Sequence, residues 1–195
     1  PPRTTRRAGG RPAAGQHPPH TGRAATAPAT GAPAARAGAA PPPLLATGAT
    51  VEVESVRGSR TVEAADFFVG VKCNALEPDE LIAAFHVRPA AGPQQFAKVG
   101  TRNAMVIAVC SFALDVSEGR VGTCIGSAGP KPIRARAAEA VAVGPPAYSE
   151  EAGVEFGRLV ADAASPIDDV RGSAAYRRHA LGVLAQRTLK WALCG

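Results

Sequence analysis

The sequence predicts an α+β protein. We expect a small antiparallel sheet of about three strands, covered by C-terminal helices and preceded by a further β-rich layer and a disordered N-terminal tail. Three observations lead to this prediction. Residues 49–129 contain short alternating or β-branched apolar runs separated by turn residues. Residues 135–193 have helical spacing with serines at N-cap positions. Residues 1–43 contain no Val, Leu, Ile, Phe, Tyr or Trp.

The composition of residues 1–43 predicts disorder, because Ala, Pro, Gly, Arg and Thr cannot bury enough apolar area to offset the entropy lost on ordering. This tail holds six arginines and no acid, so the remaining 16 basic and 16 acidic side chains leave the rest of the chain neutral. The net charge of +6 therefore belongs to the tail. A neutral body without interleaved aromatic and basic residues argues against a nucleic-acid-binding surface.

Residues 49–93 predict the first β-rich layer. ATVEVESVRG alternates apolar and polar residues with period two, Arg57–Arg60 supplies turn chemistry, and TVEAADFF (61–68) follows, so a hairpin leading into a short helical turn is expected. The run Leu81–Val87 predicts a further strand, which Pro89, Gly92 and Pro93 end.

Residues 95–129 predict the antiparallel sheet. QFAKVGTR is one strand, AMVIAVCSFALDV is a long second strand, and VGTCIGSAG returns after the SEGR turn as its hairpin partner. Three glycines thin the returning strand, at Gly122, Gly126 and Gly129. Their missing side chains would let a helix or another backbone approach closely.

The rest of the chain predicts three helices: residues 135–143, residues 149–164 with Ser149 as N-cap, and residues 174–193 with Ser173 as N-cap. Five residues are expected to form the buried stripe of the last helix: Tyr176, Ala180, Val183, Leu184 and Trp191. Arg187 falls within that stripe and needs an acidic partner. We therefore expect Asp168 or Asp169 to pair with Arg187 or Arg177.

Signatures of catalysis and metal binding are missing from the sequence. It has no G-x-S-x-G, H-E-x-x-H, P-loop or G-x-G-x-x-G motif, and none of its four cysteines forms a C-x-x-C pair. His17 and His20 lie in the tail, where nothing preorganises a metal site. Cys110 and Cys124 fall on paired strands but are expected to be buried, reduced thiols.

Four runs in one order carry a family resemblance: FAKVGTRNAM (96–105), IGSAGPKPIRA (125–135), SPIDDVRGSAAYRRHAL (165–181) and RTLKWAL (187–193). Together they resemble the C-terminal part of the FAD-binding medium subunit of molybdenum hydroxylases, the xanthine dehydrogenase and carbon monoxide dehydrogenase flavoprotein family. The resemblance covers about three quarters of the chain, from Pro42 onward. It implies a remnant of the FAD-binding domain at 44–93 and the C-terminal flavoprotein domain at 94–195.

The resemblance implies two cofactor-binding residues, Lys98 near the flavin and Ile82 against its ring, and no catalytic or metal-binding residue. The alternatives are a snorkelling or salt-bridged Lys98 and a core Ile82. Where the family has a basic residue followed later by an acid, this chain reads Arg102-Asn103. The glycine-rich loops that wrap the FAD pyrophosphate in this family are not legible here, so binding of FAD by this chain alone is expected to be weak or lost.

The resemblance implies a cytoplasmic oxidoreductase subunit. Its partners would be a molybdopterin-binding large subunit and an iron–sulfur small subunit, with electrons passing from the clusters through FAD to NAD or another acceptor. The alternative is a cofactor-free remnant that acts only as a subunit-docking module. No run reaches the roughly 18 consecutive apolar residues of a membrane span.

Overall fold

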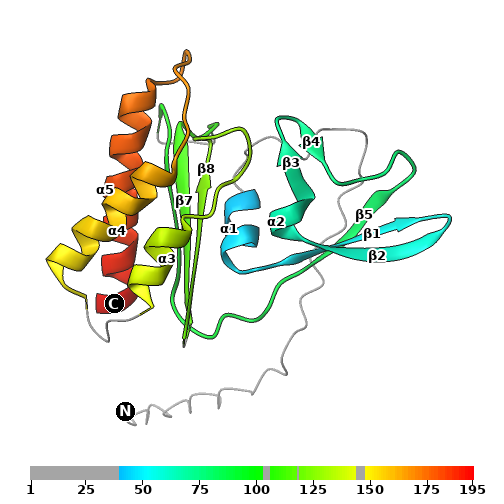
Figure 1. Cartoon of the computed structure of the whole chain (residues 1–195), viewed down its shortest axis with the longest axis horizontal. Coiled ribbons are helices and arrows are strands. Elements are labelled where there is room, and N and C mark those ends of the chain that lie inside the picture. Colours follow the sequence, from blue (N-terminus) through cyan, green and yellow to red (C-terminus); the bar gives the residue numbers. More distant parts are fainter. Residues whose placement is uncertain (1–39, 103–105, 118, 144–147) are drawn as a thin grey trace, which may run out of the picture.

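The structure is a computed structural model that describes residues 40–102, 106–117, 119–143 and 148–195. It is an α+β fold with antiparallel sheets, as the sequence predicted (Figure 1). In chain order the elements are α1 (Pro41–Ala46), β1 (Thr50–Ser55), β2 (Gly58–Glu63), α2 (Ala64–Phe67), β3 (Phe68–Gly70), β4 (Cys73–Asn74), β5 (Leu81–His86), β6 (Gln94–Val99), β7 (Cys110–Ser117), β8 (Arg120–Gly126), α3 (Arg136–Ala142), α4 (Glu150–Ala163) and α5 (Ala174–Cys194).

The predicted first layer forms an antiparallel sheet of order β2-β1-β5, and the two-stranded sheet β3-β4 lies between β2 and β5 in the chain. The hairpin and the short helix α2 are confirmed, with Val51 opposite Val62 and Ser55 opposite Gly58. Val51 and Val53 point from β1 into a core that includes Leu45 of α1 and Phe67 of α2. The β2-β1-β5 sheet lies on the side of α1 that faces away from the C-terminal helices (Figure 1), and the first core also includes Ala113 of β7 and Cys124 of β8.

The second sheet has the order β6-β7-β8, and its hairpin β7–β8 confirms the prediction. One of its faces carries Phe112, Leu114 and Ile125 into a core shared with α3, α4 and α5. The strand β7 begins at Cys110, later than expected, because the chain turns before it. Val106 fills the space beside Gly100, where a Cβ would lie 2.4 Å from Val106 Cγ1.

The opposite face of this sheet is built from glycines and small residues, and α1 lies directly against it. A Cβ on Gly122 would lie 1.9 Å from the carbonyl oxygen of Ala46, and a Cβ on Gly126 would lie 2.7 Å from Cγ of Pro42. The prediction that the glycines admit a helix is therefore confirmed for Gly122 and Gly126, whereas the side chain of Ile133 fills the space at Gly129. The helix also corrects the predicted end of the tail, because residues 41–43 are helical, and Pro41 and Pro42 are buried. Residues 1–39 lie outside the described residues.

The helical layer follows its predicted caps and only part of its predicted stripe. Ser149 accepts from the N–H of Ala152, and Ser173 accepts from the N–H of Tyr176. The predicted stripe of α5 is partly right, since Ala180 is buried and Leu184 packs against the core, but Tyr176 and Trp191 are about half exposed. The buried positions of α5 are Arg177, Ala180, Leu181, Ala185, Thr188, Leu189 and Ala192. Small residues face the core because α4 and α5 approach closely, and a Cβ on Gly157 would lie 2.6 Å from the carbonyl oxygen of Gly182.

The segment before α5 is fixed by the ion pair between Asp169 and Arg177, which confirms one of the expected pairings. The other candidate, Arg187, is exposed. The Arg177 side chain is 6% exposed and also donates to the carbonyl of Ser127. The Asp168 carboxylate instead accepts a hydrogen bond from the N–H of Ala174 at the start of α5. Among the described helices, none is long and apolar enough to cross a membrane.

We predict that Gly122→Ala lowers the free energy of unfolding by about 1–3 kcal/mol, because the new Cβ must push α1 away from β8. Urea denaturation measures this. Gly182→Ala is the control, since its Cβ would meet its nearest neighbour at 3.4 Å and alanine favours a helix interior. Equal stability of the two variants would contradict the close seating of α1.

We predict that Asp169→Asn lowers the melting temperature by about 5–10 °C, because it leaves the buried guanidinium of Arg177 without its carboxylate. Asp162→Asn, which removes an exposed pair with Arg158, should change it by no more than about 2 °C. Thermal unfolding followed by circular dichroism distinguishes the two.

The effect of Asp169→Asn should also depend on pH. In the wild type, the hydrogen bond that Arg177 donates to Asp169, supported by the N–H of Arg171, holds the pKa of Asp169 below its ordinary value. The stabilisation is therefore complete above the ordinary carboxyl pKa of about 3.9 and is lost as the pH falls through the lower folded value. Melting curves of the wild type and the variant should differ equally at pH 6 and pH 8 and converge below about pH 4. A difference that stays constant into that acid range would contradict the pairing.

Candidate functional site

The best candidate site is the exposed face of β6, formed by Gln94, Phe96 and Lys98 (here called the β6 face). Strand register places these three residues opposite Asp115, Ala113 and Ser111 of β7, in that order. They therefore continue, at the sheet edge, the same face on which α1 lies. Within the described residues, β6 pairs with no strand other than β7.

The two halves of this face differ in their covering. Over β7 and β8 it is buried, because Ala113 and Cys124 belong to the core that contains Leu45 and Ala46 of α1. At β6 it is open, with Phe96 42% exposed and Lys98 exposed. An aromatic ring and an ammonium group thus lie two residues apart on a flat, accessible strand. This combination suits a planar ligand that accepts negative charge.

Lys98 is held at this edge by a single described hydrogen bond. Its Nζ donates to the carbonyl oxygen of Val106 at 3.3 Å, across the turn that precedes β7. Because a carbonyl is a neutral partner, the ammonium keeps its charge and further donors for another acceptor. Arg102 is exposed just beyond the end of β6, and Asn103 lies outside the described residues.

Ile82 lies in the other sheet. It is opposite Val53 on β1, next to a register shift, and packs partly buried against the core that contains Phe67. The described contacts therefore place Ile82 with the first core and Lys98 with the second sheet. They do not bring Ile82 and Lys98 together in one site.

The four cysteines are all free thiols. Cys110 and Cys124 are buried and unpaired, and burial raises the pKa of Cys110 to about 11 and the pKa of Cys124 further. Cys73 and Cys194 are exposed and free. Within residues 40–102, 106–117, 119–143 and 148–195, no group of three or more His, Cys, Asp or Glu side chains is arranged to hold a metal ion.

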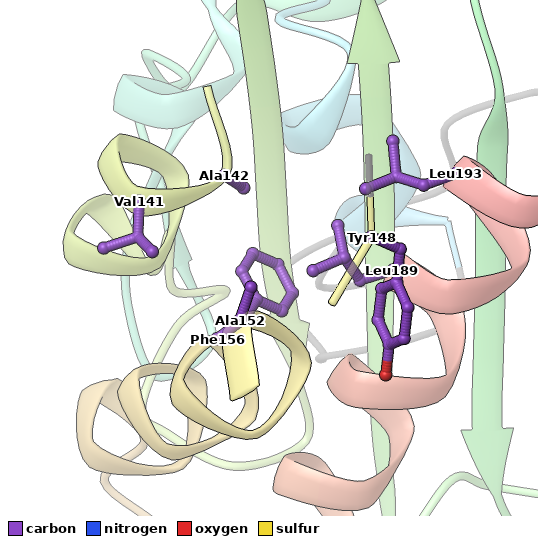
Figure 2. A pocket seen from close by; sticks show the side chains of 7 residues that line it. All are labelled: Val141, Ala142, Tyr148, Ala152, Phe156, Leu189 and Leu193. Carbon is purple, nitrogen blue, oxygen red and sulfur yellow. The ribbon is translucent and has the colours of Figure 1, made fainter. Parts of the chain in front are cut away.

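Two hollows lie away from the β6 face. One is an apolar cavity of about 10 Å³ between α3, α4 and α5, large enough for about one water molecule (Figure 2). The other lies beside the β1–β2 turn, where Arg60 forms two hydrogen bonds to Glu80 and lowers the pKa of that carboxyl to about 2. The ion pairs Arg60–Glu80 and Arg57–Asp79 fasten the loop before β5 to the hairpin.

Sequence reasoning missed a polar cluster at the other end of the same sheet face. Arg120 donates to Asp115 at 2.7 Å and to the carbonyl oxygen of Ala46 at 2.8 Å, and Gln94 donates to Asp115 at 3.0 Å. Arg120 and Ala46 are separated by 74 residues, so no local pattern could reveal this contact. The cluster ties the C-terminal end of α1 to the β7–β8 hairpin.

Comparison with known proteins assigns both parts of the chain. Residues 95–192 match the CO dehydrogenase flavoprotein C-terminal domain, and residues 29–90 match the FAD binding domain in molybdopterin dehydrogenase. The second match begins before Pro42, the residue from which the sequence resemblance was legible.

Curated relatives agree with this assignment. The chain is 38% identical over 159 residues to the nicotine 6-hydroxylase medium subunit of Paenarthrobacter nicotinovorans. The aligned region covers 78% of this chain and 55% of the relative. The chain is 30% identical over 152 residues to the glyceraldehyde dehydrogenase medium chain of Sulfolobus acidocaldarius, covering 75% and 54%. The chain thus spans about half the length of the curated relatives it matches.

Solved structures have the same fold. The reconstituted CO dehydrogenase from Oligotropha carboxidovorans matches with a TM-score of 0.71 and 26% identity over 82% of this chain and 59% of that chain. Quinoline 2-oxidoreductase from Pseudomonas putida 86 matches in fold with a TM-score of 0.72 at 24% identity, over 81% and 57%. The chain therefore belongs to the FAD-binding medium-subunit family of the molybdenum hydroxylases, and the β6 face lies in its C-terminal flavoprotein domain.

Proposed function

We propose that this chain is the ring-binding part of an FAD-carrying medium subunit, and that the β6 face lies beside the flavin ring. The observation that carries the proposal is the open half of the sheet face, where Phe96 and Lys98 are exposed while α1 covers the rest. The gap between the two family matches, from residue 90 to residue 95, supports a domain boundary near residue 94.

The residues of the chain suit one end of the cofactor. Phe96 offers an apolar surface for a planar ring, and Lys98 offers a cation with free donors at its edge. The pyrophosphate end needs several backbone N–H groups from glycine-rich loops, and those loops are not legible in this sequence. The proposal therefore places the ring end in this chain and the main pyrophosphate grip outside it.

Lys98 supplies electrostatic stabilisation. FAD, when bound, accepts and releases electrons, and its reduction places negative charge on the pyrimidine side of the ring. An ammonium held at the strand edge would stabilise that charge. Its tether to Val106 orients the group without neutralising it. Ile82 stays a prediction, since its buried part packs in the first core and only its remaining surface is free to meet a ring.

The wider assembly follows from the family. We propose a molybdopterin-binding large subunit and an iron–sulfur small subunit as partners, cytoplasmic location, and transfer of electrons from the clusters through FAD to NAD or another acceptor, as in xanthine dehydrogenase. The alternative is a cofactor-free remnant that acts only in subunit docking. Flavin binding at the β6 face separates these two functions, because the remnant would bind none there.

We predict that the purified 195-residue chain carries well under one equivalent of FAD. Charge-assisted hydrogen bonds to a pyrophosphate contribute about 1.5–3 kcal/mol each, so losing several of them removes most of a submicromolar affinity. Absorbance between about 350 and 500 nm, where oxidised flavin absorbs, measures the content. A yellow protein with near-stoichiometric FAD would show that the chain holds the complete grip.

We predict that Lys98→Gln makes the midpoint potential of a bound flavin more negative, because the reduced, negatively charged ring loses its cation. The probe is lumiflavin, which contains the ring without ribityl chain or phosphates, titrated at high protein concentration. Wild type should raise the potential of lumiflavin above that of the free molecule, and Lys98→Gln should abolish most of the rise.

Lys131→Gln is the matched control, since Lys131 is also exposed but lies beyond β8. It should keep the wild-type potential, and both variants should melt within about 2 °C of wild type. Identical potentials for the Lys98 and Lys131 variants would remove Lys98 from the site.

A further inference from the structure

The residues around Gly48 place two arginines side by side at the junction of the two sheets. Gly48 follows α1 and has φ +64°, a conformation that glycine adopts without strain. A Cβ at this position would lie 3.1 Å from Nη2 of Arg120 and 3.5 Å from Nη2 of Arg88. Two guanidinium groups therefore flank one point beside the backbone of Gly48.

One of the two guanidinium groups is fixed in place. Arg120 donates to the carboxylate of Asp115 and to the carbonyl oxygen of Ala46, and the Asp115 side chain is only 4% exposed. The Arg120 side chain itself is 32% exposed, so its outer edge remains open to solvent. A guanidinium held in this way loses little freedom when it binds a ligand.

The second guanidinium group is uncompensated. Arg88 follows β5 and is exposed, and within the described residues it forms no hydrogen bond or ion pair. The local charge of Arg88, Arg120 and Asp115 together is +1. Like charges so close repel, and an anion between them removes that repulsion while accepting hydrogen bonds from both groups.

We propose that Arg88 and Arg120 form an oxyanion site of the phosphate class beside Gly48. A tetrahedral anion with two or more charged oxygens can accept from both guanidinium groups at once, which a chloride ion cannot do with the same geometry. Glycine at position 48 keeps a side chain out of the approach. This site does not depend on the proposed flavin function, because Arg120 begins β8 whereas Lys98 lies level with Gly126 at its end.

The direct test is isothermal titration of the 195-residue chain with inorganic phosphate at low ionic strength in a zwitterionic buffer. We expect saturable binding in the millimolar range, weakened at least tenfold in Arg88→Gln. Arg88→Lys keeps the charge but loses the planar guanidinium, so its affinity for phosphate should lie between those of the wild type and Arg88→Gln. Arg57→Gln is the control, because Arg57 lies at the other end of β1 and pairs with Asp79.

A second measurement separates binding from folding. Phosphate should raise the melting temperature of wild type and of Arg57→Gln, and should leave that of Arg88→Gln unchanged, since only a ligand of the folded state stabilises it. Sulfate should reproduce the effect of phosphate, and acetate at the same concentration should not. Absence of saturable binding in wild type, equal binding by Arg88→Gln, or equal effects of acetate and phosphate would each overturn the proposal.

Discussion

The fold depends on the contact between α1 and the glycine side of β8. A single short helix, PPPLLA, contacts both sheets, because Leu45 packs in the first core while Ala46 and Pro42 lie against β8 of the second sheet. The approach is a backbone contact, since the carbonyl oxygen of Ala46 occupies the place of a side chain at Gly122. Figure 1 shows α1 between the β7–β8 hairpin and the β1–β2–β5 sheet.

This contact decides which part of the sheet face is available for binding. The helix is six residues long and covers β7 and β8, so the outer strand β6 keeps Phe96 and Lys98 accessible. On the other side of the same sheet, α5 and its partners bury Phe112 and Leu114. Three helices cover one face of the sheet, whereas α1 covers only part of the opposite face. The candidate site lies on the part that α1 leaves uncovered.

Much of this fold was legible in the sequence because its signals are local. Alternation in ATVEVES, the serines at Ser149 and Ser173, and the glycines of β8 each predicted a feature that the structure confirms. The α5 stripe was wrong at its two ends, Tyr176 and Trp191, because large residues were favoured there over small ones. At a close helix crossing, alanine and glycine occupy the interface while Tyr176 and Trp191 keep their amphipathic rings at the surface.

The site itself was only partly predictable. The motif around Lys98 pointed to that residue. It did not reveal that Phe96 shares the same open face, or that α1 leaves this face uncovered. The polar groups around Asp115, Arg120 and Ala46 come from distant parts of the chain. Their proximity depends on how α1 seats on the sheet, and that is a tertiary property without a sequence pattern.

The central claim is that the β6 face receives a flavin ring. Hydrogen–deuterium exchange of the 195-residue chain, with and without saturating lumiflavin, tests it most directly, because the result is read strand by strand. We expect slower exchange in peptides covering Gln94–Val99, with the β1–β2 hairpin unchanged. Unchanged exchange over Gln94–Val99, or protection confined to another element, would contradict it.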